Sequence, residues 1–68
     1  MEFKENLKQL RLQNGLTQAQ LAEKLFVSRS TVAKWENGLG LPNPESMAAI
    51  EKLFDVVAEE LATKEPER

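Results

Sequence analysis

The sequence contains no cysteine and no histidine among its 68 residues. Without cysteine it can form no disulfide and no thiolate metal site, and without histidine the commonest metal ligand and the usual general base are missing. Its three glycines do not form a phosphate-cradling loop, and no nucleophile is paired with a base in a recognisable pattern. We therefore expect no enzyme activity, no cofactor and no bound metal.

Long apolar runs are also missing, so we expect no membrane span, and the charged N-terminus is unlike a signal peptide. Hydrophobic residues make up 41% of the chain and charged residues 29%, which is typical of a globular protein. A chain of this length forms one small domain at most. We expect a soluble, cytoplasmic protein with one domain over residues 1–63 and a frayed charged tail over residues 64–68.

The formal net charge of −2 argues against nucleic acid as a partner when it is read as a single number. Its distribution along the chain is uneven. Residues 1–34 contain six basic and three acidic side chains, whereas residues 35–68 contain three basic and eight acidic ones. This asymmetry indicates a polar molecule with one face suited to an anion.

Breaker residues divide the first half of the chain into short segments with helical periodicity. The first segment ends at Asn14 and Gly15. Thr17 with Gln20 three residues later matches the capping box, in which two side chains satisfy two backbone amides at a helix start. A second helix therefore begins directly after Thr17.

Ser28 is a good N-cap for a third helix, so the second helix ends only a few residues before it. Two short helices with such a tight corner are typical of a helix-turn-helix. Asn43 followed by Pro44 predicts the start of a fourth helix, and a short fifth helix contains Leu61. No strand is signalled, so the sequence predicts an all-α, compact five-helix domain.

Helical phasing separates two faces of the predicted third helix. The core anchors of the second and third helices are Leu21, Ala22, Leu25, Val32 and Trp35. The opposite face is short and positively charged, and a helix of this width fits the major groove of DNA. Exposed basic and hydroxyl side chains are more often ordinary solvated surface, so this face alone leaves both interpretations open. The residues of this positively charged face are Arg29, Ser30, Ala33, Lys34 and Asn37.

Three further polar residues need an interpretation. Gln18 lies just inside the second helix, where free amides and the helix dipole suit a phosphate, although simple helix-start polarity explains it equally well. Arg11 and Glu36 are placed either to form an ion pair between the first and third helices or to be two exposed charges. Spacing does not decide between these two possibilities.

The segments LTQAQLAEKL, VSRSTVAKWENG and PNPESMAAIEKLFDV, preceded by Arg11, resemble the phage repressor and Cro-like, or Xre-type, helix-turn-helix transcriptional regulators. The resemblance covers the chain from Leu7 to Leu61. It implies a lambda-repressor-like bundle, with the helix-turn-helix at the second and third helices. It also implies a recognition helix over residues 28–37 that enters the major groove.

The resemblance further implies a role for individual residues. It matches Arg11 and Glu36 to a structural ion pair. It matches Gln18 to a residue that braces the recognition helix. It implies base-edge contacts from Arg29, Ser30 and Lys34, with Ala33 beside them. It implies phosphate contacts from Gln18, Ser28, Thr31 and Asn37.

We therefore expect a sequence-specific transcriptional regulator, a repressor, that binds double-stranded DNA at a pseudo-palindromic operator as a homodimer through its C-terminal helices. The alternative is an antitoxin-like or protein-interaction module that docks a partner protein. It is motivated by the acidic second half and by apolar residues near the C-terminus, which are Met47, Phe54, Val57 and Leu61.

Two positions depart from the family pattern. Phe26 occupies a turn position where many relatives have glycine, so it either accepts a positive φ with strain or reshapes the turn. Val57 stands near the position of a serine cap and cannot cap a helix with its side chain. This second departure concerns the start of the fifth helix.

Overall fold

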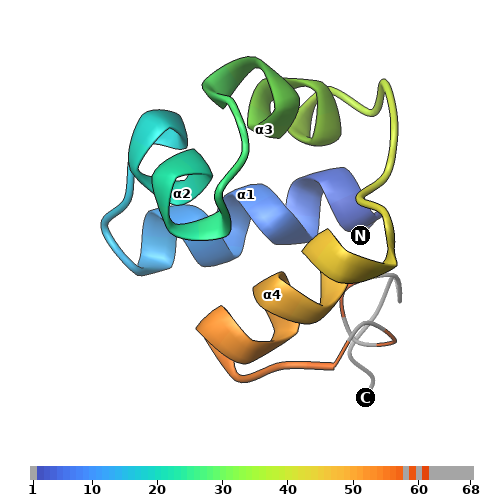
Figure 1. Cartoon of the computed structure of the whole chain (residues 1–68). Helices are drawn as coiled ribbons and strands as arrows, with labels where there is room; N and C mark the ends of the chain where they lie inside the picture. The colour runs from blue at the N-terminus through green and yellow to red at the C-terminus, as the bar shows by residue number, and fades with distance from the viewer. Residues whose placement is uncertain (1, 58, 60, 62–68) are drawn as a thin grey trace.

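The structure is a computed structural model that describes residues 2–57, 59 and 61 of the chain. No strand occurs among these residues, which confirms the all-α prediction. The described residues form four helices (Figure 1): α1 (Phe3–Gln13), α2 (Gln18–Leu25), α3 (Arg29–Glu36) and α4 (Pro44–Phe54).

The predicted number of five helices is therefore wrong for the described part of the chain. Glu59 and Leu61 have helical backbone, and the Leu61 amide donates to the Val57 carbonyl over 3.3 Å. This is the ordinary helical bond to the carbonyl four residues earlier, and Val57 has no side-chain oxygen that could cap the turn. The rest of the expected fifth helix and the expected frayed tail over residues 64–68 lie outside the described residues.

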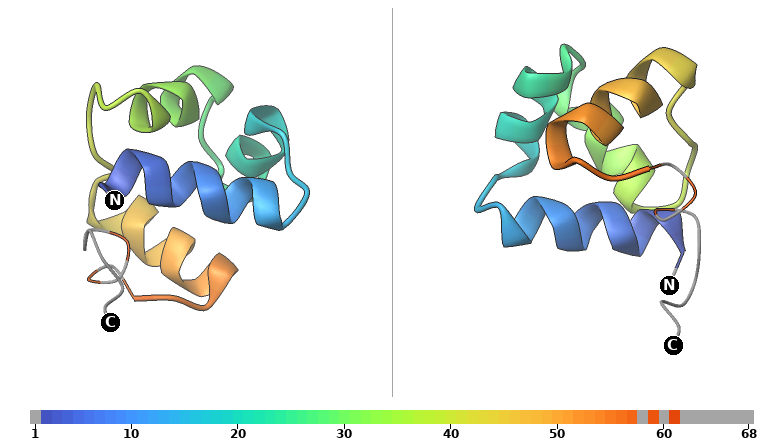
Figure 2. Two further views of the ribbon diagram at one scale, coloured as in Figure 1. Left: turned by 180° about the vertical axis from the view of Figure 1, so that it is seen from behind. Right: turned by 90° about the horizontal axis from the view of Figure 1, so that it is seen from below.

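The four helices are arranged with α1 across the middle of the molecule (Figure 1). The view from behind in Figure 2 shows the same order, with α3 at one end and α4 at the other. Helix α2 lies beside α3, and the two are joined by a short turn (Figures 1 and 2). One side of α3 consequently lies at the edge of the molecule, where no other described helix covers it.

The predicted helix starts are confirmed by their hydrogen bonds. The Gln20 amide donates to Thr17 Oγ1 over 3.0 Å, and the Thr17 amide donates to Gln20 Oε1 over 2.9 Å, which completes the capping box of α2. Ser28 Oγ accepts from the Thr31 amide at the start of α3, and Asn43 Oδ1 accepts from the Ser46 amide at the start of α4. Because each cap replaces water at a backbone amide, each stabilises its helix by about 1 kcal/mol.

All four helices end in one backbone geometry. The first or second residue after each helix is left-handed, with φ of 68° at Gly15, 61° at Phe26, 75° at Gly38 and 57° at Asp55. The following amide then reaches back to a carbonyl five residues earlier, as in the 3.0 Å bond from Val27 to Ala22. This is the Schellman ending, which normally selects glycine because glycine has no Cβ penalty there.

Gly38, at the end of α3, also lies close to a side chain of α1. A Cβ at this position would lie 3.1 Å from Cδ of Lys4, which belongs to the first turn of α1. Larger residues would meet both a strained backbone and a crowded neighbour. The glycine therefore lets the loop after α3 pass close to the start of α1.

The core lies where the helices meet. The five expected core anchors are all buried, with exposed fractions of at most 6%. Leu61 is also buried, and its carbonyl accepts a hydrogen bond from Asn6 Nδ2 of α1. The described chain therefore remains packed against α1 well beyond α4. The buried apolar residues are Phe3, Leu7, Leu21, Ala22, Leu25, Val32, Trp35, Ile50 and Leu61.

Candidate nucleic-acid interface

Helix α3 has one buried face and one open face. Val32 is fully buried and Trp35 is 6% exposed. Arg29, Ser30 and Lys34 are exposed on the other side. The indole of Trp35 is therefore occupied in the core and is not a stacking platform for bases, as the phasing of the sequence predicted. The polar side chains of the open face remain free to approach a ligand.

Smaller side chains leave this open face uncluttered. Ala33 is half-buried, and Asn37, which ends α3, is exposed. The Asn37 amide donates to the Ala33 carbonyl over 3.0 Å, so the backbone at the end of the helix is internally satisfied. The face is thus a short strip of two cations separated by small residues.

Three hydroxyl groups gather at the first turn of α3. Ser28 Oγ accepts from the Thr31 amide over 3.2 Å, and it lies 2.8 Å from Thr31 Oγ1 and 3.1 Å from Ser30 Oγ. This cluster was not foreseen as a unit, although the spacing of Ser28, Ser30 and Thr31 could have indicated it. It connects the cap of α3 to the open face through hydrogen bonds among the three hydroxyls.

Arg11 and Glu36 form a bidentate ion pair. Arg11 Nε lies 2.7 Å from Glu36 Oε2, and Arg11 Nη2 lies 3.0 Å from Glu36 Oε1. The two side chains are only 9% and 3% exposed. Arg11 Nη1 also donates to the Leu16 carbonyl over 2.9 Å, which ties α1 and the start of α2 to the end of α3. Of the two possibilities left open by the sequence, the structure has the paired one.

Gln18 connects both ends of α3. Its Nε2 donates to Glu36 Oε1 over 3.1 Å, and its Oε1 accepts from Arg29 Nη1 over 3.1 Å. The family resemblance implied that Gln18 braces the recognition helix, but it did not identify Glu36 and Arg29 as the partners. These contacts depend on how α2 crosses α3, and no local pattern in the sequence reports that crossing.

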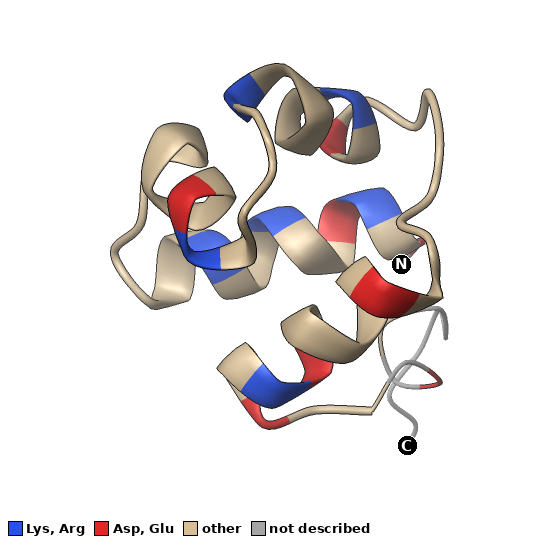
Figure 3. Cartoon of the chain, viewed as in Figure 1, with Lys and Arg blue, Asp and Glu red and all other residues tan. Residues whose placement is uncertain are grey.

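The charge asymmetry along the sequence becomes an asymmetry in space (Figure 3). Within α3 the single carboxylate, Glu36, is turned inward to Arg11, so the open face presents Arg29 and Lys34 without a competing anion. Helix α4, at the other end of the molecule, contains two acidic residues and one basic residue, and Asp55 follows it. A polyanion would therefore meet the α3 end of the molecule more favourably than the α4 end.

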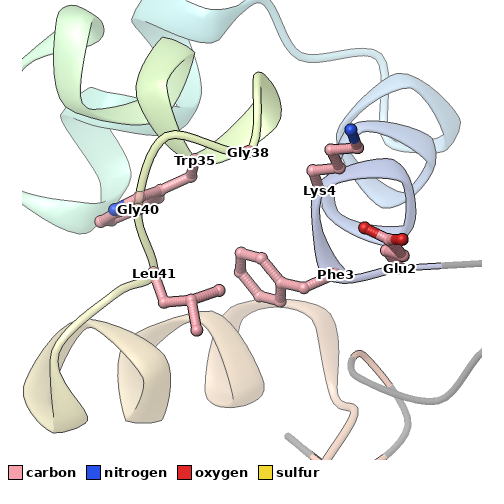
Figure 4. Close-up of a pocket in the computed structure, with 7 residues that line it drawn as sticks. All are labelled: Glu2, Phe3, Lys4, Trp35, Gly38, Gly40 and Leu41. Atoms are coloured by element: carbon pink, nitrogen blue, oxygen red, sulfur yellow. The ribbon is translucent and has the colours of Figure 1, made fainter.

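The loop after α3 leaves a small hollow beside α1 (Figure 4). Figure 4 shows Phe3 and Leu41 at its edge, with Trp35 behind the loop. Leu41 and Leu39 of this loop are about three-quarters exposed, at 72% and 73%. The hollow belongs to the packing between α1 and the end of α3 and contains none of the polar residues expected to contact DNA.

Within the described residues, no helix has the length and apolar character needed to cross a membrane. The same part of the chain brings together no cluster of three acidic, histidine or cysteine residues that could hold a metal ion.

Residues 7–61 match the family HTH_3, whose description is helix-turn-helix. The transcriptional activator BcrR of Enterococcus faecalis is 54% identical over 65 residues, which are 96% of this chain and 32% of that protein. The cryptic phage CTXphi transcriptional repressor RstR of Vibrio cholerae is 34% identical over 61 residues, which are 90% of this chain and 54% of that protein. The chain thus spans about a third of the first relative and about half of the second.

Solved structures agree with this assignment. A crystal structure of a transcriptional regulator from Listeria innocua superposes with a TM-score of 0.86 at 33% identity, over 98% of this chain and 63% of that one. The family match covers most of the chain, including the capped corner between α2 and α3 described above. These findings confirm the predicted resemblance to helix-turn-helix transcriptional regulators. The chain belongs to the helix-turn-helix family HTH_3.

Proposed function

We propose that this chain is the DNA-binding domain of a sequence-specific transcriptional regulator, with α3 as its recognition helix in the major groove. The observation that carries the proposal is the open face of α3. Arg29, Ser30 and Lys34 are exposed there, while Val32 and Trp35 hold the helix to the core. Membership of the helix-turn-helix family and relatives named as transcriptional regulators support the same function.

On this proposal the open face reads base edges. Arg29 donates to the two acceptors of a guanine edge, Lys34 reaches a guanine or a neighbouring phosphate, and Ser30 donates or accepts. Ala33 lets the helix approach closely because its side chain is small. Each good side-chain–base pair contributes roughly 1–3 kcal/mol of discrimination against a wrong base.

The edges of the helix-turn-helix would contact the phosphates on either side of the groove. Gln18 lies at the first position of α2, next to backbone amides that attract an anion. Its NH₂ group uses one hydrogen on Glu36 and has a second hydrogen for a phosphate oxygen. The other proposed phosphate contacts come from the two ends of α3, from Ser28, Thr31 and Asn37.

A homodimer would place two recognition helices on one side of the duplex, about 34 Å apart, and would read a pseudo-palindrome. Leu53 and Val57 support a dimer interface near the end of α4, because they are apolar and 38% and 53% exposed. Leu61 does not belong to such a surface, since it is buried against α1. The apolar surface expected near the C-terminus is therefore smaller than the sequence suggested.

The two named relatives act in opposite directions, one as an activator and the other as a repressor. Repression by this chain accordingly stays a prediction. The proposed binding of α3 in the major groove is compatible with both activation and repression.

Selection of bound duplexes from random DNA tests the proposal. We expect one enriched motif, and the logarithm of its affinity should fall linearly with the logarithm of salt concentration because phosphate contacts release counterions. Lack of enrichment, together with a salt slope near zero, would exclude the DNA-binding function. Capture of a basic partner protein by the same sample would then favour the protein-docking alternative.

A further inference from the structure

We propose that Glu36 is a positioning residue for base readout, because its carboxylate sets the orientation of the Gln18 amide and that amide holds Arg29. The inference rests on the proposed function and assigns a specificity determinant to the same surface. Glu36 itself lies inside the domain, with a side chain that is 3% exposed. It would act on DNA only through its two neighbours.

The orientation of the Gln18 amide follows from the chemistry of its partners. A carboxylate can only accept hydrogen bonds and a guanidinium can only donate them. Gln18 lies between the two, with Nε2 3.1 Å from Glu36 Oε1 and Oε1 3.1 Å from Arg29 Nη1. Rotating the amide by 180° would place an NH₂ group against the guanidinium and an oxygen against the carboxylate. Only one of the two orientations is therefore compatible with both neighbours.

Glu36 is suited to this role because it does not move freely. Two hydrogen bonds from Arg11, of 2.7 and 3.0 Å, hold its carboxylate at a fixed place under α3. Arg29, in contrast, is exposed and has a long side chain with many rotamers. Gln18 bonds to this fixed carboxylate and to Arg29. The exposed Arg29 side chain is therefore restrained by the buried pair of Arg11 and Glu36.

The contact with Gln18 leaves Arg29 able to read a base. It uses Nη1 as the donor, so the edge of the guanidinium formed by Nε and Nη2 can still donate in a bidentate manner. A tethered guanidinium loses less rotamer entropy when it binds than an untethered one. The tether should therefore increase the preference for the base pair that Arg29 reads, over and above general affinity.

The test measures a ratio of two affinities. The first duplex is the selected operator. The second duplex differs from it at a single base pair, the one for which Arg29→Ala loses its preference. The ratio does not depend on the fraction of folded protein, because unfolding weakens binding to both duplexes equally. A merely structural role of Glu36 would leave the ratio unchanged, whereas a positioning role would lower it.

Glu36→Gln is the first variant, since an NH₂ group replaces one of the acceptor oxygens. The second variant, Arg11→Met with Glu36→Met, removes the carboxylate without leaving a buried unpaired charge, so that the fold survives. We expect both variants to lower the ratio roughly 2- to 10-fold, which corresponds to one net hydrogen bond. The ratio at an operator position not read by Arg29 should stay unchanged.

Gln18→Ala is the control that tests whether Glu36 acts on Arg29 through Gln18. In that background the link between Glu36 and Arg29 is already cut, so Glu36→Gln should cause no further loss of preference. The positioning role is overturned if the ratio is unchanged in both Glu36 variants, or if Glu36→Gln lowers it equally with and without Gln18. Either result leaves the proposed DNA-binding function standing. If the unmodified chain enriches no sequence, or Arg29→Ala changes no preference, base readout by Arg29 fails and the inference fails with it.

Discussion

Phe26 has the same left-handed backbone at the end of α2 that Gly15 has at the end of α1. The two residues have φ values of 61° and 68°, and each is followed by an amide that bonds back into its helix. The turn of the helix-turn-helix therefore keeps the Schellman geometry without its usual glycine. The Phe26 ring gains little from its surroundings, because the residue is 93% exposed. This relationship leads to a prediction about stability.

Phe26→Gly should stabilise the domain relative to Phe26→Ala. Both variants remove the exposed ring, but only glycine removes the Cβ conflict of the left-handed backbone, which costs about 1–2 kcal/mol. Glycine also lowers the free energy of unfolding by about 0.5–1 kcal/mol, because its unfolded chain has more conformational entropy. Urea denaturation should thus show the glycine variant more stable by up to about 1.5 kcal/mol, and a less stable glycine variant would contradict strain at this turn.

Arg11→Ala should destabilise the domain by about 3–5 kcal/mol, because it leaves the Glu36 carboxylate buried without its partner. Replacing both residues by methionine should cost far less, since no buried charge remains. Thermal unfolding followed by circular dichroism compares the two variants. Equal losses in both would mean that packing, and not charge pairing, accounts for the effect.

Thr17→Ala should cost roughly 0.5–2 kcal/mol of unfolding free energy, because the Gln20 amide loses its acceptor at the start of α2. Gln20→Ala removes only the reciprocal bond to the Thr17 amide and is the matched control. Chemical denaturation should rank the threonine variant as the less stable of the two. The opposite order would show that the glutamine arm dominates the capping box.

Arg29→Ala should remove the preference at one base pair of the operator, a loss of roughly 1–3 kcal/mol in discrimination. Lys52→Ala removes one cation from α4, at the other end of the molecule, and controls for net charge. Binding to a panel of single-base operator variants measures both. A uniform loss across the panel in the arginine variant would instead assign Arg29 to phosphate contact.

Much of the fold could be predicted because its signals are local. The caps at Thr17, Ser28 and Asn43 depend on residues three positions away, and the core anchors follow from helical periodicity. The predicted fifth helix was less secure, since Val57 offers no side-chain cap. Leu61 illustrates what local patterns miss: its apolar character suggested a free surface, yet Asn6, distant in sequence, holds its carbonyl against α1.

The candidate site was predicted only in part for the same reason. Phasing a single helix shows which side chains share a face, and α3 has the exposed face that phasing predicted. The contacts of Gln18 with Arg29 and Glu36 involve sequence separations of 11 and 18 residues and depend on the crossing of two helices. No spacing rule within one helix contains that information.

The burial of Trp35 has a practical consequence for spectroscopy. It is the single tryptophan of the chain, and it lies in the core on the side of α3 away from Arg29 and Lys34. Its fluorescence should change strongly on unfolding, when the indole enters water, and little when DNA meets the open face. Emission from one native residue thus distinguishes a variant that binds poorly because it is unfolded from one that is folded but has lost its contacts.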